Sequence, residues 1–440
     1  MKHILIIGAG LSSSYLIRYL LEHSEKYSWK ITVADTDPDL ANRKVNDHSN
    51  GLAISLNVQH AGELNAAVSQ ADLVISMLPA IMHIQVAHVC LQHRKHLFTA
   101  SYISEEMKSL HIEALKSNVL FLNECGLDPG IDHMSAMKMI HDIQQQGGEI
   151  QSFKSYCGGL IAPAYDTNPW HYKFTWNPRN VVLAGKSTAR YKENGGLKFI
   201  PHTRIFTQTE NVKVHSGESF DAYANRDSLE YIHPYGIESV HTVLRGTLRG
   251  KGFCAAWNAL VQLGLNDDSF SIEFPEGMNF RSWLDAFVQD MPDKSLEERV
   301  AWQLQTDQQG EIMQKLTWLG LFDPKPLGIH EGSPAAVLEH LLLDKWPLQT
   351  GDLDRIIMHH EIGYSLNGVT KVLKSSLEVI GEDEMYTAMS KTVGLPLGIA
   401  AKLLLTGKIK SSGVHIPVIP EFYQPILEEL ETLGISFIES

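Results

Sequence analysis

Cysteine is scarce in this sequence and widely scattered. The four cysteines, Cys90, Cys125, Cys157 and Cys254, form no Cys-x-x-Cys pair. Their spacing argues against a disulfide framework or a structural zinc site and favours a reducing, cytoplasmic location. Long apolar runs are missing too, since none approaches the roughly 18–20 residues of a membrane span. The first expected strand starts at residue 3, which leaves no room for a signal peptide, so we expect no membrane partner.

Basic residues are also in deficit. The chain has 37 Lys and Arg against 51 Asp and Glu, and its formal net charge is −14. Because a general nucleic-acid binder presents a basic face, we expect no nucleic-acid partner. An anionic small molecule would instead need locally placed arginines. At 440 residues and 44% hydrophobic, the chain is long enough for two or three globular domains.

The first 125 residues alternate short apolar runs with helix-like stretches. In the first such stretch, Leu16, Ile17, Leu20 and Leu21 form one stripe at helical spacing. Buried strands separated by crossover helices predict an α/β fold with a doubly wound parallel sheet of the Rossmann type. The six apolar runs are 4–7, 31–34, 53–56, 73–78, 97–100 and 119–122.

A glycine motif follows the first of these runs. Gly8 permits a tight turn, and Gly10 lets the backbone approach a pyrophosphate at a helix N-terminus. Ser13 takes the third glycine position, where a small residue suffices. Asp35 ends the next strand about 22 residues later, where an acidic side chain suits the ribose 2′-hydroxyl and repels the 2′-phosphate of NADP. We therefore expect NAD as the cofactor, with NADP as the alternative and a simple turn residue as the other interpretation of Asp35.

Ligands of open α/β sheets lie beyond the carboxyl ends of the strands. Three segments end strands in this way: Ser76–Pro79, Ala100–Tyr102 and Glu124–Asp128. Asp128 is the strongest candidate for catalysis or substrate contact, although an Asp before Pro129 is also typical of a helix N-cap. Tyr102 is a second candidate, with an ordinary core tyrosine as the alternative.

The segment from 150 to 252 is rich in strand-like sequence and holds a row of arginines. If Val243–Arg249 is a strand, Arg245, Thr247 and Arg249 point to one face, with the arginines about 13 Å apart at roughly 3.3 Å per residue. Two guanidinium groups at that separation could grip the ends of a long dicarboxylate, and Arg226 could add a third contact. The alternative is a solvated edge strand. Residues 253–330 have the spacing of a small helical insertion.

No metal site is expected. His359, His360 and Glu361 are adjacent, but neighbouring residues of a strand face opposite ways, and the His-Glu-x-x-His spacing is absent.

Several motifs together resemble saccharopine dehydrogenase of the glutamate-forming type, over essentially the whole chain. The motifs are Gly126–His133, Ser155–Gly159, Tyr172–Pro178, Asn225–Ser228, Leu244–Arg249 and Ala388–Pro396. The resemblance implies a reversible condensation of L-glutamate with 2-aminoadipate 6-semialdehyde to an imine, which NAD(P)H reduces to saccharopine. It also implies a homodimer with three domains: a Rossmann domain (1–127 plus 386–440), a mixed α/β substrate and dimerisation domain (128–252 plus 331–385), and the helical domain (253–330).

The resemblance also assigns residues by matching position. Ser101, Tyr102, Asp128, Arg226, Thr247 and Arg249 should contact saccharopine, with Gly158 and Gly159 offering backbone amides to a carboxylate. The matching cofactor positions are Gly10, Leu11, Ser12, Ser13, Asp35, Thr36, Asn57, Val58, Met77, Leu78 and Pro79. NADP users in the family have a basic or neutral end to the second strand, and Asp35 and Thr36 depart from that pattern.

The chemistry of the expected substrate agrees with the residues. Saccharopine carries three carboxylates, which suits Arg226, Arg245 and Arg249. Imine formation needs a proton donor for departing water, and Asp128 is the first choice for it, with Tyr102 as relay. Two alternatives remain: a carboxynorspermidine-type dehydrogenase, whose polyamine substrate has fewer carboxylates, and a non-catalytic dinucleotide-sensing protein.

Overall fold

Two large β-sheets organise the computed structural model, which describes residues 1–440. The first sheet has seven strands in the order β17-β6-β5-β4-β1-β2-β3, and every neighbouring pair is parallel. Each of the six apolar runs overlaps one of its strands, so the predicted parallel sheet is confirmed. The strands are β1 (Lys2–Ile7), β2 (Trp29–Asp35), β3 (Gly51–Ser55), β4 (Leu73–Ser76), β5 (His96–Thr99), β6 (Leu120–Leu122) and β17 (Gly413–His415).

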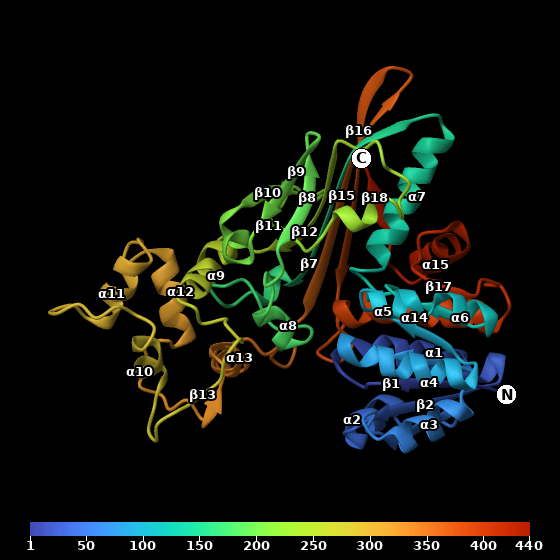
Figure 1. Ribbon diagram of the computed structural model, residues 1–440, viewed down its shortest axis with the longest axis horizontal. Helices are drawn as coiled ribbons and strands as arrows, with labels where there is room; N and C mark the ends of the chain where they lie inside the picture. Colours follow the sequence, from blue (N-terminus) through green and yellow to red (C-terminus); the bar gives the residue numbers. More distant parts are fainter.

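Helices cover both faces of this sheet. Alternate residues of β1 serve the two faces: Ile4 and Ile6 belong to one buried cluster, and Leu5 and Ile7 to another. The first cluster includes α1 and α14, and the second includes α3 and α4 (Figure 1). The helices of this region are α1 (Ser14–Tyr27), α2 (Pro38–Val45), α3 (Ala61–Gln70), α4 (His83–His93), α5 (Glu105–Ser109), α6 (His111–Lys116), α14 (Ala388–Leu405) and α15 (Pro420–Thr432).

Helix α14 is long and apolar enough to meet the length and composition of a membrane span, which the sequence analysis did not anticipate. In this structure it is mostly buried against α1. Two glycines allow the close approach: a Cβ at Gly394 would lie 2.7 Å from the backbone nitrogen of Leu16, and one at Gly398 would lie 2.7 Å from the ring of Tyr19. In this structure α14 is therefore a buried helix that packs on one face of the first sheet.

The second sheet is mixed and has nine strands. Its main path is β10-β11-β12-β7-β15-β16-β18, with the β8–β9 hairpin attached through β12. Only β12 and β7 pair in parallel. The last strand, β18, departs from the expected division, because residues near the C-terminus join this sheet rather than the first. The strands are β7 (Glu149–Ile161), β8 (Ala189–Glu193), β9 (Gly196–Ile200), β10 (Thr209–Lys213), β11 (Ser219–Ala224), β12 (Thr242–Arg249), β15 (Asp354–Leu366), β16 (Val369–Ile380) and β18 (Phe437–Glu439).

His359 and His360 are adjacent residues of strand β15. His359 bonds Ser376 on β16 at 2.7 Å, whereas His360 bonds Ser135 on α7 (Ile131–Gln145) at 2.7 Å. The two rings therefore face opposite sides of the strand, as the sequence predicted.

A small helical domain extends from the second sheet. Its buried cluster joins Trp170 and Trp346 to Phe253 and Trp257 of α9, whose rings stack on each other at 5.5 Å. A two-stranded ribbon, β13 (Ile272–Glu273) with β14 (Glu331–Gly332), adds to the helices that the sequence predicted. The helices are α8 (Pro178–Val182), α9 (Phe253–Gln262), α10 (Phe280–Asp285), α11 (Leu296–Gln303), α12 (Glu311–Leu319) and α13 (Pro334–Lys345).

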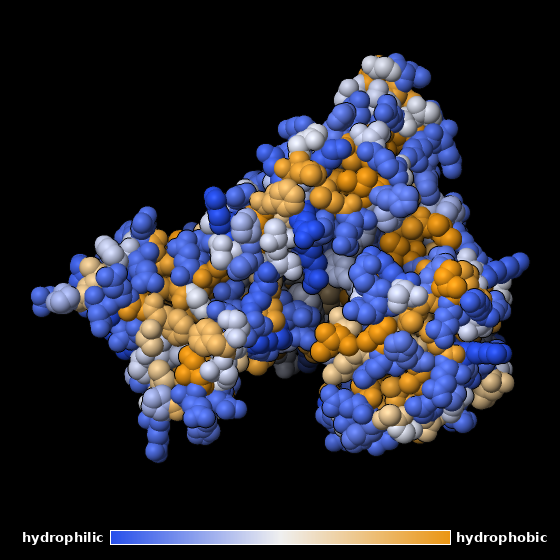
Figure 2. Space-filling view, viewed as in Figure 1, coloured by the Kyte–Doolittle hydropathy of each residue, from blue (hydrophilic) through white to orange (hydrophobic).

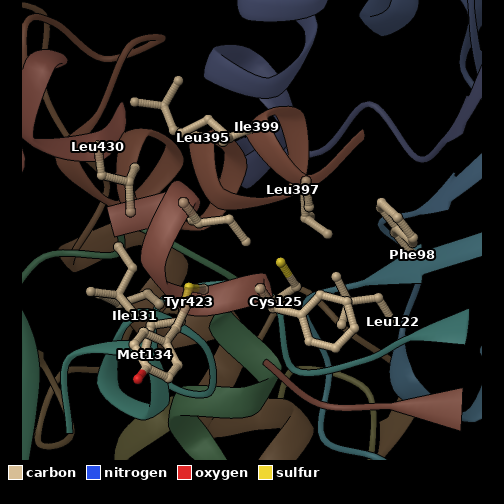
Figure 3. Packing of buried hydrophobic residues seen from close by; sticks show 14 of the residues in the cluster. Phe98, Leu122, Cys125, Ile131, Met134, Leu395, Leu397, Ile399, Tyr423 and Leu430 are labelled. Atoms are coloured by element: carbon tan, nitrogen blue, oxygen red, sulfur yellow. The ribbon is translucent and has the colours of Figure 1, made fainter. Parts of the chain in front are cut away.

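The turn between β6 and α7 joins the two sheets and is fixed by packing on both sides. Figure 3 shows Cys125, Ile131 and Met134 from this segment facing Leu395 of α14 and Tyr423 of α15. In Figure 2 the surface is hollowed between the first sheet's domain and the helical domain. The rigid turn therefore carries its polar side chains to the region where the two sheets meet.

Candidate active site

The glycine turn after β1 has the geometry of a dinucleotide loop. Gly8 has φ +105°, and a Cβ there would lie 3.0 Å from the carbonyl oxygen of Met77, so the position requires glycine. Ser13 is fully buried and donates from Oγ to the Gly10 carbonyl at 2.9 Å. Nothing lies within 4 Å of a Cβ placed on Gly10. The outer side of the loop is therefore open to a phosphate group, and the residues fit a bound dinucleotide.

Asp35 faces the same loop. Its carboxylate accepts the Ala9 backbone N–H at 2.7 Å and the Asp37 backbone N–H at 3.0 Å, and the Thr36 hydroxyl lies 3.3 Å away. The sequence analysis missed Lys44 of α2, whose ammonium donates to the Gly10 carbonyl and to Ser13 Oγ. Burial lowers the pKa of Lys44 to about 8, an effect that the charge of Asp35 opposes. The acidic Asp35 and the basic Lys44 thus both border the glycine loop.

The remaining predicted cofactor residues end neighbouring strands. Asn57 and Val58 follow β3, and Met77–Pro79 follow β4, with Met77 donating its backbone N–H to Ile7 at 2.8 Å. Leu11 and Ser12 lie in the turn itself, where Leu11 is exposed. The parallel topology brings these ends to one edge of the sheet, as expected for a nucleotide site.

A buried histidine organises the loop after β5. His83 Nε2 lies 2.8 Å from Ser101 Oγ, and its Nδ1 lies 2.9 Å from Ser76 Oγ. Burial lowers the pKa of His83 to about 4, so the ring is neutral at physiological pH. His83 could not be predicted from the sequence, because nothing near it in the chain marks its partners.

Tyr102, Asp128 and Arg245 form the centre of the site. The Tyr102 hydroxyl donates to Asp128 Oδ1 at 3.1 Å, and Arg245 Nη2 contacts the same oxygen at 2.5 Å. The N-cap interpretation of Asp128 is wrong, because α7 begins at Ile131 with Gly130 as its N-cap. Burial raises the pKa of Asp128, although Arg245 opposes the shift, and burial likewise raises the pKa of Tyr102. The raised pKa makes Asp128 a candidate for proton exchange with a substrate.

Behind this centre lies a buried polar layer that the sequence analysis did not single out. Glu124, with φ +53°, accepts the backbone N–H of Ile103 at 2.9 Å and contacts His133 Nε2 at 2.7 Å. The Glu124 N–H also donates to the Ser101 carbonyl at 3.1 Å. Glu124 thus ties the loop that carries Tyr102 to helix α7. Its place at the start of the Glu124–Asp128 segment was the only available signal.

The arginine row is present, but Arg245 does not act as predicted. Arg245 Nη2 contacts Asp132 Oδ2 as well as Asp128, each at 2.5 Å, so its charge is already engaged and it is not free to grip a substrate carboxylate. Sequence spacing could not reveal this, because both partners come from another part of the chain.

Arg249 and Arg226 remain available. Arg249 is 4% exposed and lies against the rings of Tyr172, Tyr223 and Phe253, at 5.3 to 5.9 Å. Its only hydrogen bond is to the Leu248 carbonyl at 3.0 Å, and its Nε has no partner. Arg226 is exposed and stacks over Tyr102 at 4.7 Å. Neither guanidinium has a carboxylate partner within the protein, whereas Arg245 has two.

Three further predicted residues line the same strands. Thr247 pairs with Cys157, the last β7 residue in register with β12. Gly158 and Gly159 continue β7 beyond that point while still pairing with β15. Their contact with substrate stays a prediction. The structure adds the thiol of Cys157, whose pKa is raised by burial and by the nearby carboxylates of Asp128 and Asp132.

Comparison with known families supplies the decisive observation. The family model for the saccharopine dehydrogenase NADP binding domain matches residues 4–122, and the model for the saccharopine dehydrogenase C-terminal domain matches residues 126–435. The chain belongs to the saccharopine dehydrogenase family. The resemblance and the α/β fold class inferred from the sequence are therefore confirmed.

Individual relatives span the whole chain of this family member. A Schizosaccharomyces pombe protein named saccharopine dehydrogenase [NADP(+), L-glutamate-forming] is 33% identical over all of this chain and 99% of the relative. The mouse mitochondrial alpha-aminoadipic semialdehyde synthase is 34% identical over 99% of this chain, which spans 47% of that protein. The name of the S. pombe relative and the NADP binding domain model do not support the expected NAD preference.

Solved structures agree with the family assignment. The structure of apo histidine-tagged saccharopine dehydrogenase (L-Glu forming) from Saccharomyces cerevisiae has a TM-score of 0.89 and 31% identity, covering 100% of this chain and 99% of that one. The homospermidine synthase of Legionella pneumophila has a TM-score of 0.55 at 10% identity, a likeness of fold alone.

Proposed function

We propose that this protein is a glutamate-forming saccharopine dehydrogenase of lysine metabolism. It interconverts L-saccharopine with L-glutamate and L-2-aminoadipate 6-semialdehyde through an imine, with an NAD(P) nucleotide as the hydride carrier. The membership of the family and the names of its full-length relatives support this reaction.

The single observation that carries the substrate assignment is Arg249. A cation that is 4% exposed and has no acidic hydrogen-bond partner is costly unless an anion completes it. The three aromatic rings around the guanidinium hold its plane, and the Nε–H remains free to donate. A substrate carboxylate would supply the missing negative charge by charge-assisted hydrogen bonds. Arg226, exposed beside Tyr102, is placed to receive another carboxylate.

Asp128 is the group that moves a proton. In the direction of condensation, the glutamate amine adds to the aldehyde carbon and the resulting hydroxyl must leave as water. The protonated Asp128 donates to that hydroxyl while the nitrogen lone pair forms the C=N bond. In the reverse direction, the Asp128 carboxylate takes a proton from the water that adds to the imine carbon. Burial raises the pKa of Asp128, which favours its protonated, proton-donating form.

An NAD(P) nucleotide, when bound, would supply the acceptor for the hydride from the aminoadipate-side carbon of saccharopine's secondary amine, and the donor in the opposite direction. The chain's own contribution is alignment. Gly8, Gly10 and Ser13 would hold the dinucleotide at the edge of the first sheet, and Ser101 and Tyr102 follow the end of β5 on that edge. His83 and Glu124 hold this loop in place.

For the nucleotide we propose NADP, in keeping with the relatives. Asp35 opposes a 2′-phosphate by its charge, but its carboxylate is engaged by the Ala9 and Asp37 amides. Lys44 supplies a positive charge on the same loop, through Gly10 and Ser13. The two charges offset each other, so we expect NAD to be accepted as well.

The test is an assay of the purified protein with L-saccharopine and either nucleotide at alkaline pH. We expect reduced nucleotide and glutamate in equal amounts, with NADP giving the higher kcat/KM. A faster reaction with NAD would keep the substrate and reject the nucleotide proposal. Nucleotide binding without any turnover of saccharopine would reject the reaction, and carboxynorspermidine would then be the substrate to try before a sensor role is considered.

The quaternary state and location belong to the same proposal. We propose a cytoplasmic homodimer, supported by the resemblance to the family and by four cysteines that are all free and buried. Light scattering during gel filtration measures the mass of the protein in solution. A monomeric mass at the assay concentration would contradict the proposed homodimer.

A further inference from the structure

Arg245 is shared by two carboxylates, the buried Asp132 and the mostly buried Asp128. Its Nη2 atom lies 2.5 Å from both Asp128 Oδ1 and Asp132 Oδ2, and the side chains of Arg245, Asp128 and Asp132 are 7%, 17% and 2% exposed. One guanidinium cannot neutralise two carboxylates, and solvent has little access to do so. The excess negative charge must therefore be removed by a proton on one of the two acids, in the way that like charges sharing a site behave elsewhere.

The surroundings decide which acid takes the proton. Asp132 Oδ1 accepts the Gly130 backbone N–H at 2.6 Å, and Asp132 Oδ2 lies 3.8 Å from His133 Nδ1. Asp128 has no backbone donor and only the Tyr102 hydroxyl besides Arg245. Burial opposes ionisation of both, but His133, Arg245 and the Gly130 amide hold the pKa of Asp132 below its usual range, while the pKa of Asp128 is raised.

We propose that Asp132 is a positioning residue for the reaction: by holding Arg245 from the other side, it keeps the proton on Asp128. Asp132 itself touches no reacting atom. Its fixed negative charge, anchored at the first turn of α7, makes Asp128 a proton donor for imine formation rather than a permanently ionised partner of Arg245. This proposal rests on the proposed function, since Asp128 acts on the proton of the substrate's departing water.

Few other charges bear on Asp128. The groups near it are the cation Arg245, the imidazole His133, the carboxylate Asp132, the phenols Tyr102, Tyr223 and Tyr235, the thiol Cys157 and, stacked over Tyr102, the cation Arg226. Burial raises the pKa of each phenol and of the thiol, so these groups are uncharged at neutral pH. Asp132 is therefore the negative charge whose removal should change Asp128 most.

The sign of the effect follows directly. Saccharopine oxidation needs Asp128 as the carboxylate, so kcat/KM rises with pH through the pKa of Asp128. In Asp132→Asn, Arg245 serves Asp128 alone and the carboxylate form is favoured. The acid limb of the pH profile should move to lower pH by about one unit or more. Arg245→Gln removes the cation and should move the same limb to higher pH.

The experiment compares the pH profiles of wild type, D132N, R245Q and the control D142N. Asp142 lies on the same helix, pairs with Lys138 and is 52% exposed, so its profile should match wild type. Opposite shifts in D132N and R245Q support the proposal. A D132N profile that is lower in rate but unshifted overturns it, as does a shift to higher pH. If R245Q fails to fold, the sign of the shift in D132N decides alone.

A second readout is independent of activity. In protein labelled with ¹³C at the aspartate carboxyl carbon, the signal missing from D128N reports the titration of Asp128. We expect its midpoint to fall in D132N, and an unchanged midpoint refutes the proposal. If wild type does not oxidise saccharopine, the proposed function fails, but this titration still tests how Asp132 acts on Asp128.

Discussion

Replacing Arg249 by alanine tests the substrate assignment most directly. In the free protein this guanidinium has no carboxylate hydrogen-bonded to it, because Nη1 reaches only the Leu248 carbonyl and Nε has no partner. The substitution therefore leaves no buried acid unpaired and should cost mainly packing against Tyr172, Tyr223 and Phe253. The folded protein should survive it.

The substitution should instead weaken the binding of saccharopine. Removing one partner of a buried charge pair typically costs about 2–5 kcal/mol, and each 1.4 kcal/mol is about tenfold. Since Arg249 contributes at least its free Nε–H, we take the lower half of that range. The expected fall in kcat/KM for saccharopine is then roughly 30- to 300-fold, carried mostly by KM.

The assay is the initial rate of nucleotide reduction over a range of saccharopine concentrations, together with the dissociation constant of the nucleotide alone. The nucleotide constant should not change. Arg204→Ala is the matched control, because Arg204 is exposed in the same domain and forms no ion pair. A KM for saccharopine within about threefold of wild type in R249A would refute the reasoning, since the buried cation would then have another purpose.

Asp128→Asn should lower kcat by about 10²–10⁴-fold with little change in nucleotide affinity; unchanged turnover would remove Asp128 from the mechanism. Arg245→Ala leaves two buried carboxylates unpaired and should lower the free energy of unfolding by about 3–5 kcal/mol, measured by urea denaturation, with R249A as the milder comparison. Asp35→Ala should raise the NADP-to-NAD ratio of kcat/KM by roughly tenfold, or about 1.4 kcal/mol; an unchanged ratio would show that Asp35 does not face the ribose.

Much of the fold could be predicted because its signals are local. Apolar runs of four to six residues formed the strands of the first sheet, and the stripe containing Leu16 and Leu20 formed the buried face of α1. The glycine turn was predictable for the same reason, since Gly8 adopts a conformation that side chains disfavour. The apolar sequence from 387 to 405 predicted the length of α14, but its close packing on α1 was not anticipated, because Gly394 matters only through that contact.

For the candidate site, too, some features could be predicted from the sequence and others could not. The residue types and their order along the chain pointed to Tyr102, Asp128 and the arginines, and their motifs pointed to the family. The partners of those residues could not be predicted: Arg245 lies 117 and 113 positions from Asp128 and Asp132, and His83 lies 18 from Ser101 on a different element. Nothing local encodes such pairs.

The sequence by itself determined that the chain builds a parallel nucleotide-binding sheet, that an acidic turn follows it, and that arginines alternate along β12. Periodicity and turn chemistry act over a few residues, so these features are readable without a structure. Only the tertiary structure decided which charges meet. The packing of α7 and the turn before it on the second sheet places two aspartates at Arg245, whereas no acid reaches Arg249. Arg245 therefore acts on the proton donor, and Arg249 is left to bind a substrate carboxylate.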